Sequence, residues 1–180
     1  MPRVREIEDD GGDPILKELF AKERELFGSL FNTTKVFAHC PPILKAAQQL
    51  SASIEKSGRL PAALVPLVYL RVALINGCPF LIDINASRGM QAGADEDKIR
   101  EVPGWRESRR FSEVERAALE YAEAMTITGQ RVSDELFARL RSLFDEAQVV
   151  ELTAAVALEN FRSKFNVPLG IEAQGFCLLR

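Results

Sequence analysis

The sequence predicts an all-α protein, folded as a single domain over residues 1–180. Apolar residues recur every three or four positions along most of the chain, which is the spacing of one helix face. Proline, glycine and small polar residues stand where such stretches begin and end. No set of alternating apolar and polar residues indicates the strands of a sheet.

Asp13 followed by Pro14 marks the start of the first helix. An aspartate accepts hydrogen bonds from the first turn, and proline lacks an N–H that would be unpaired there. Apolar residues then follow helical spacing as far as Leu30. The same signals predict helices over residues 33–37, with Thr33 or Thr34 as cap, over 42–57 and 61–76, and from Pro79 to Gly89 or Gly93.

The second half of the chain carries clear N-cap signals. Ser112 and Glu115 form the capping-box pattern, in which each side chain accepts a hydrogen bond from the backbone of the other. Further N-cap candidates are Asp95, Ser133 and Asp145. These caps predict helices over residues 96–102, 113–128, 134–144 and 146–166. The apolar tail over 171–180 is expected to pack on its own core or on a neighbouring subunit.

The composition excludes several classes of protein. Apolar residues make up 47% and charged residues 27%, as in ordinary globular proteins. A net charge of −3 offers no basic surface for nucleic acid or an anionic membrane. No apolar run approaches the roughly 18 residues of a membrane span. The single histidine, His39, excludes a multi-histidine metal site within one chain, and we expect no cofactor.

Cysteine usage and helix apolarity indicate where the protein works and how it assembles. Cys40, Cys78 and Cys177 are too widely spaced for a secreted disulfide framework, so we expect a reducing cytoplasm. The start of the chain has no apolar signal region. Residues 64–75 and 149–158 are apolar on more than one side, as in deeply buried helices. We therefore expect a homo-oligomer that buries these helices between subunits.

Cys78 is the residue with the clearest chemical potential. Pro79 suits the first turn of a helix, so Cys78 is expected at or near the N-cap. Unpaired amides and the positive end of the helix dipole favour a thiolate there. The alternative is that Cys78 is a small buried hydrophobic residue, a common fate of a free cysteine.

The order of motifs resembles the alkylhydroperoxidase-D-like (AhpD-like), or carboxymuconolactone decarboxylase, superfamily. The resemblance is carried by a core region of about 60–102, which contains the run Asn-Gly-Cys-Pro-Phe-Leu-Ile-Asp-Ile-Asn at 76–85 and the turn Gly-Ala-Asp at 93–95. Trp105 and the segments 111–119, 151–153 and 159–166 fit the same family. The resemblance covers most of the chain and implies an all-α domain that forms homo-oligomers, usually a trimer or hexamer, with a dimer also possible.

The resemblance also implies a site. Peroxidase members carry a glutamate followed by Cys-x-x-Cys-x-x-x-His, in which the glutamate and histidine move protons and the two cysteines reduce the peroxide. Here the glutamate position holds Pro66, the first cysteine is Cys78, the second is Leu81, and the histidine is Asn85. The family implies an alkylhydroperoxidase-like oxidoreductase with peroxiredoxin-type antioxidant activity. The residues allow at most a one-cysteine variant through Cys78.

Other functions stay open beside this one, including that the chain is not an enzyme. The changes at Pro66, Leu81 and Asn85 make the site apolar and neutral, which favours a non-peroxidase relative that binds a small apolar or carboxylate-bearing ligand instead of a hydroperoxide. Lactone decarboxylation, the other named activity of the family, needs protonatable groups that the site lacks. A purely structural helical oligomer is the fourth possibility, and it would lack a closed pocket.

Asn160 and Asn166 could line a polar pocket near Cys78, although polar residues at a helix end need no such role. Cys177 could resolve an oxidised Cys78 only if the tail folds over that residue.

Several further residues are predicted to have no catalytic role. Asp83 is expected on the helix surface or at a subunit contact, and Glu123 and Glu159 have ordinary helical neighbours. His39 could in principle pair with the thiol of Cys40, but neighbouring residues often point apart.

Overall fold

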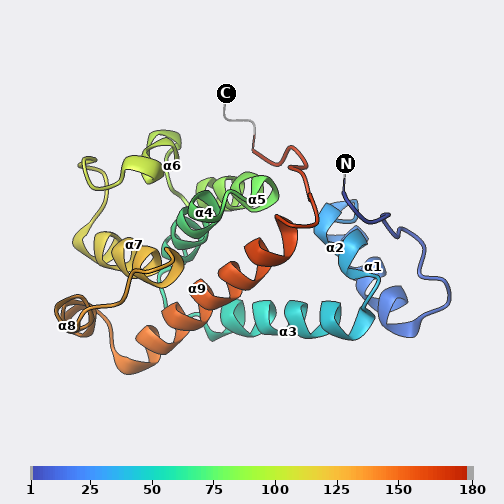
Figure 1. The fold of residues 1–180 in the computed structure, drawn as a ribbon, viewed down its shortest axis with the longest axis horizontal. Coiled ribbons are helices and arrows are strands. Elements are labelled where there is room, and N and C mark those ends of the chain that lie inside the picture. Colours follow the sequence, from blue (N-terminus) through green and yellow to red (C-terminus); the bar gives the residue numbers. More distant parts are fainter. Residues whose placement is uncertain (1, 178–180) are drawn as a thin grey trace.

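The computed structural model describes residues 2–177, which contain nine α-helices, one short 3₁₀ helix and no strand. The predicted all-α class is confirmed. The helices are α1 (Pro14–Phe27), α2 (Asn32–Phe37), α3 (Pro41–Ser57), α4 (Leu64–Asn76), α5 (Pro79–Gln91), α6 (Glu96–Glu101), η1 (Val102–Gly104), α7 (Glu113–Thr126), α8 (Asp134–Leu143) and α9 (Glu146–Asn166). Figure 1 shows α1 and α2 at one end of the molecule and α8 at the other, with α3 and the long α9 running between them.

The core is built around α4, which packs against α5, α7 and α9. Leu67, Val68 and Val72 on this helix have no exposed surface. The all-round apolar character of α4 is therefore satisfied within one chain, and it needs no second subunit to explain it. α9 differs, because it leaves Val150 and Phe161 exposed. The homo-oligomer stays a prediction.

Several helix starts follow the predicted capping. The Asp13 carboxylate accepts hydrogen bonds from the backbone N–H groups of Ile15 (2.8 Å) and Leu16 (3.0 Å). Ser112 and Glu115 form the expected capping box at the start of α7. These contacts are made between residues close in sequence, so local chemistry is enough to place the helix starts.

Other boundaries differ from the prediction, each for a physical reason. α1 ends at Phe27 and not near Leu30, because Gly28 adopts a left-handed φ of 77° and caps the helix. α2 is not capped by Thr33 or Thr34, whose hydroxyls instead donate to Asn166 and Glu23. The start of α4 also differs from the prediction, and this difference involves the proline at position 66.

α4 begins at Leu64 and not at Pro61. Pro66 is consequently the third residue of the helix, in the turn where backbone N–H groups have no intrahelical partner. Its missing N–H therefore removes no hydrogen bond from the helix. The proline shortens α4 at its start without breaking it.

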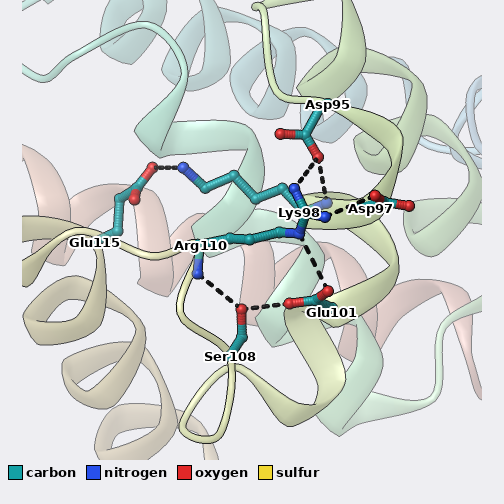
Figure 2. A network of polar contacts seen from close by, with 7 residues as sticks. All are labelled: Asp95, Asp97, Lys98, Glu101, Ser108, Arg110 and Glu115. Atoms are coloured by element: carbon teal, nitrogen blue, oxygen red, sulfur yellow. Dashed lines mark hydrogen bonds and ion pairs between the residues drawn. The ribbon is translucent and has the colours of Figure 1, made fainter.

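The connection between α6 and α7 is held by ion pairs on the protein surface (Figure 2). The Arg110 guanidinium contacts Asp97 at 2.7 Å and Glu101 at 3.2 Å, and Ser108 also donates to Glu101. Lys98 reaches across to Glu115 of α7 at 2.6 Å. Exposed pairs of this kind contribute little each, but together they fix the path of the loop. In the described part of the chain, no helix is long and apolar enough to cross a membrane.

Candidate functional site

Cys78 is the N-cap residue of α5, as predicted. Its side chain has no exposed surface, and it lies in an apolar cluster with Ala73, Phe80 and Ile171. The one side-chain hydrogen bond to its sulfur comes from Asn166 of α9, whose Nδ2 donates to Sγ at 3.6 Å. The three cysteines, at 40, 78 and 177, are free thiols.

Two opposing effects act on the Cys78 thiol. Burial raises its pKa, because a thiolate is poorly solvated among apolar side chains. The backbone N–H groups of Leu81 and Phe80 and the amide of Asn166 act in the other direction, but they do not outweigh burial. The helix start therefore supplies the expected donors, while the cluster around the sulfur favours the neutral thiol.

The C-terminal tail covers this cluster, and Asp83 holds it there. One Asp83 carboxylate oxygen accepts from the backbone N–H groups of Gln174, Gly175 and Phe176 at 2.7–3.1 Å, and the other accepts from Cys177 at 2.7 Å. Asp83 is buried, so its expected place on the helix surface was wrong. The prediction that the tail packs on its own core is confirmed for residues up to 177, and residues 178–180 lie outside the described part.

The aromatic ring of Phe176 packs on the cluster that contains Cys78. Its ring meets those of Phe31 (5.3 Å) and Phe80 (6.1 Å) edge to face. Cys177 packs against the neighbouring cluster that contains Leu67 and Trp105. The tail thus folds over the Cys78 region through Phe176, while Cys177 itself packs in a different cluster from Cys78, and its role as a resolving thiol stays a prediction.

Leu81 and Asn85, one and two turns along α5, line a cavity of about 240 Å³. Its apolar wall includes Leu19, Phe27, Phe31, Phe37, Leu44 and Ile84. Its uncharged polar groups include Thr33, Gln48, Asn85 and Asn166, and its charged groups are Lys22, Glu23, Glu55, Arg88 and Arg162. The cavity therefore lies between α5, α9 and the helices α1 to α3, and its wall combines apolar side chains with a comparable number of polar and charged ones.

The fold places the four positions of the family motif in different surroundings. Leu81 and Asn85 line the cavity, whereas Cys78 and Pro66 are not among its described lining residues. Pro66 lies beside Gly89, where an added Cβ would stand 3.8 Å from the proline Cβ and 2.6 Å from Ile99 Cδ1. It belongs to the close contact of α4 with α5 and α6.

Asn166 and Asn160, both on α9, have different surroundings. Asn166 lines the cavity, accepts a hydrogen bond from Thr33 and donates to Cys78, so it joins the cavity wall to the thiol. Asn160 is bonded to Asn76 and Thr126, each at 2.9 Å, and thereby ties α9 to α4 and α7. It is absent from the described lining of the cavity.

Glu23 was overlooked in the sequence analysis; it is a buried glutamate that lines the cavity, and burial raises its pKa. Glu159, which was given no catalytic role, is a second buried glutamate of this region. It has no exposed surface, and one carboxylate oxygen accepts from the Asn85 amide at 2.6 Å. The other oxygen is 3.5 Å from the Arg162 guanidinium. Burial raises the pKa of Glu159, and Arg162 and Asn85 compensate only in part. The one feature of the sequence that could have indicated a buried Glu159 is its position inside an apolar stretch of the helix.

The remaining candidates lie on the surface. His39 and Cys40 are exposed, and the ring Nε2 of His39 is 2.9 Å from the backbone oxygen of Arg5. Within residues 2–177, no group of three or more His, Cys, Asp or Glu side chains could hold a metal ion. The groups available for chemistry are thus a buried thiol, a buried carboxyl and the polar side chains of the cavity.

Comparison with known proteins finds a matching family model and a relative that is similar in sequence over most of the chain. The family model described as the carboxymuconolactone decarboxylase family matches residues 41–124. The uncharacterized protein YnjA of Escherichia coli is 34% identical over 164 residues, which are 91% of this chain and 90% of YnjA. A similarity of this extent covers the cavity as well as the core.

Solved structures agree on the fold. A protein of unknown function from Agrobacterium tumefaciens, described as a putative antioxidant defence protein AhpD, matches with a TM-score of 0.74 and 29% identity. The match covers 77% of this chain and 95% of that one. A cysteine-to-alanine variant of the debrominase Bmp8, in complex with 2,3,4-tribromopyrrole, matches with a TM-score of 0.84 and 18% identity over 98% of this chain and 95% of its own. With the relatives in sequence, these matches show that the chain belongs to the carboxymuconolactone decarboxylase family, with the AhpD-like fold.

Proposed function

We propose that this protein is a non-peroxidase member of its family, which binds a small, mainly apolar organic molecule in the cavity beside α5. The observation that carries the proposal is the division of the motif positions. Leu81 and Asn85 stand at the cavity, while the retained thiol of Cys78 is fully buried and outside it. A peroxidatic thiol must be reached by its peroxide and is more reactive as a thiolate, and Cys78 meets neither requirement as the chain is folded.

The cavity suits such a ligand. Apolar and aromatic side chains supply the burial that drives binding, and the amides of Asn85 and Asn166 can each donate and accept hydrogen bonds. A volume of about 240 Å³ fits a single substituted ring better than a long chain. Bmp8, which shares the fold, is described in complex with a ring of this size, a tribromopyrrole.

The test is ¹⁹F NMR with fluorobenzene and 4-fluorobenzoate as probes. We expect at least one probe to broaden or shift with the wild type, and the effect to be lost in Leu81→Trp, which fills the cavity. Val150→Trp is the matched control, because Val150 is exposed on α9 and is not among the described residues of this cavity. Equal behaviour of the two tryptophan variants, or no response to either probe, would contradict a ligand site here.

A one-cysteine thiol peroxidase through Cys78 is the second candidate, and the hydrogen bonds to its sulfur favour it. The Asn166 amide and the N–H groups at the start of α5 would stabilise a thiolate. The thiolate would attack the terminal oxygen of a hydroperoxide, the O–O bond would break, and an alcohol and a cysteine sulfenate would form. An external thiol would then reduce the sulfenate, with loss of water and formation of a mixed disulfide.

The two candidates differ in the rate at which Cys78 is modified. We expect iodoacetamide to label Cys78 at least about tenfold more slowly than Cys40, which is exposed, because labelling needs an accessible thiolate. Intact mass and peptide mapping give both rates, and Cys78→Ser identifies the site. A sulfenate trapped on Cys78 within seconds of adding an organic hydroperoxide at neutral pH would favour the one-cysteine peroxidase instead.

A further inference from the structure

Two arginines line the cavity with most of their donors unused. Arg88 of α5 has an ion pair with Glu55 at 3.4 Å, and Arg162 of α9 has one with Glu159 at 3.5 Å. These distances are near the limit of a hydrogen bond, whereas Arg71 contacts Glu123 at 2.6 Å. A guanidinium carries five N–H donors, and each of these two makes one such contact among the described residues.

Glu159 is fully buried and contacts two residues of the cavity wall, Asn85 and Arg162. The charged and titratable groups that face it come from four helices: Tyr69 of α4, Asn85 and Arg88 of α5, Arg162 of its own α9 and, farther away, Glu55 of α3 and the Cys78 thiol. Of these, the Asn85 amide and the Arg162 guanidinium make direct contact with the carboxylate. Arg162 is therefore the principal positive charge that compensates an ionised Glu159.

We infer that the ligand of this cavity carries a carboxylate bound by Arg88 and Arg162, and that Arg162 leaves Glu159 to bind it while Glu159 takes up a proton. This inference rests on the proposed function, since it names the chemical class of the same ligand. Guanidinium groups bind carboxylates through paired N–H donors, and the long existing contacts make Arg88 and Arg162 available to do so.

The proton follows from the burial of Glu159. Once Arg162 turns to the ligand, an ionised Glu159 would be a buried charge with only an amide donor, which is strongly unfavourable. The carboxylate therefore takes one proton from solvent, and a new O–H bond forms on it. The charge of the site is conserved, because one anion and one proton enter together. Burial already raises the pKa of Glu159, which acts in the same direction as the loss of Arg162.

Calorimetry with 4-fluorobenzoate and its uncharged analogue 4-fluorobenzamide tests both parts. We expect the wild type to bind the carboxylate at least about tenfold more tightly than the amide at low salt, and Arg162→Gln to remove that preference. Arg139→Gln is the matched control, because Arg139 pairs with Glu113 and Glu120 on the α7–α8 surface. Arg162→Lys keeps the charge but not the planar fork, so it should recover only part of the preference.

The proton is measured by repeating each titration in two buffers with different ionisation enthalpies. We expect uptake to grow and affinity to fall as pH rises through the pKa of Glu159 in the free protein, and Glu159→Gln to bind 4-fluorobenzoate without uptake. Carboxylate and amide bound equally well would overturn the ligand class, and uptake that persists in Glu159→Gln would overturn the proton step. Either result leaves the cavity a ligand site. Failure of the proposed function itself would be seen separately, as binding insensitive to Leu81→Trp.

Discussion

Two buried glutamates on opposite sides of α4 have opposite acidities. Glu123 of α7 accepts from the Arg71 guanidinium at 2.6 Å, from Trp105 Nε1 at 2.8 Å and from Arg106 at 2.5 Å. Burial alone would raise the pKa of Glu123, but these hydrogen bonds and charges hold it below its usual range. Glu159 of α9 has one amide donor and one distant guanidinium, and burial raises its pKa.

The comparison teaches that close cationic partners, and not burial alone, set the acidity of a carboxylate. Glu23 accepts hydrogen bonds from Phe31, Thr34 and Gln48, which are uncharged donors, and burial still raises its pKa. Glu123 is surrounded by close donors, stays ionised and joins α4, η1 and α7. Glu159 is under-compensated and stands beside a cavity, the arrangement found where a group must change its protonation state. The first is a structural ion cluster, and the second is a candidate for proton exchange.

The largest effect is expected from Glu123→Ala. The substitution removes the acceptor of Trp105 Nε1 and the carboxylate partner of Arg71, so we expect a loss of about 3–5 kcal/mol in the free energy of unfolding. Urea denaturation measures it. Glu113→Ala, which removes only an exposed partner of Arg139, should cost less than about 1 kcal/mol. A Glu123 effect as small as that of Glu113 would end the distinction between the two buried glutamates.

A smaller effect is expected from Asp83→Ala, which tests a third kind of buried carboxylate. Its donors are four backbone N–H groups of the tail, and the tail can return them to water by detaching. We therefore expect a loss of only about 2 kcal/mol, together with rapid hydrogen exchange at 174–177.

The labelling rate of Cys78 should also rise in Asp83→Ala, because the tail shields the cluster that contains the thiol. Asp134→Ala, on the exposed side of α8, serves as the control. Unchanged exchange and labelling in Asp83→Ala would mean that apolar contacts of Ile171 and Phe176 hold the tail without the carboxylate.

Whether a feature could be predicted from the sequence depended on how far apart in the sequence its interacting residues lie. The caps at Asp13 and Ser112 and the N-cap position of Cys78 depend on residues within one turn, and these predictions succeeded. The predicted cap at Thr33 or Thr34 was wrong, because both hydroxyls donate to side chains on other helices. The contacts of Asp83 with the tail join residues 91–94 positions apart, and Asn85 meets Glu159 across 74 positions. Spacing on one helix cannot reveal such partners. The family motif drew attention to Asn85, but its carboxyl partner lay on another helix, outside the motif.

The smallest effect on the free energy of unfolding is expected from Glu159→Gln, and the informative result is the direction in which this effect changes with pH. An unfolded glutamate has a pKa of about 4.3, and the folded pKa of Glu159 is raised above its ordinary value. The folded state therefore holds a proton that the unfolded state releases, so this group stabilises the wild type at low pH and loses that contribution as pH rises through the folded pKa.

Glutamine keeps the shape of the glutamate side chain and does not titrate. The stability of the wild type relative to Glu159→Gln should fall as pH rises, by at most about 1.4 kcal/mol per unit. Denaturation of both proteins between about pH 5 and pH 8.5 measures this difference. A difference that stays constant over this range would mean that Arg162 holds Glu159 ionised as firmly as Arg71 and Arg106 hold Glu123, because a lowered pKa titrates only below the unfolded value of about 4.3. The two glutamates would then be alike.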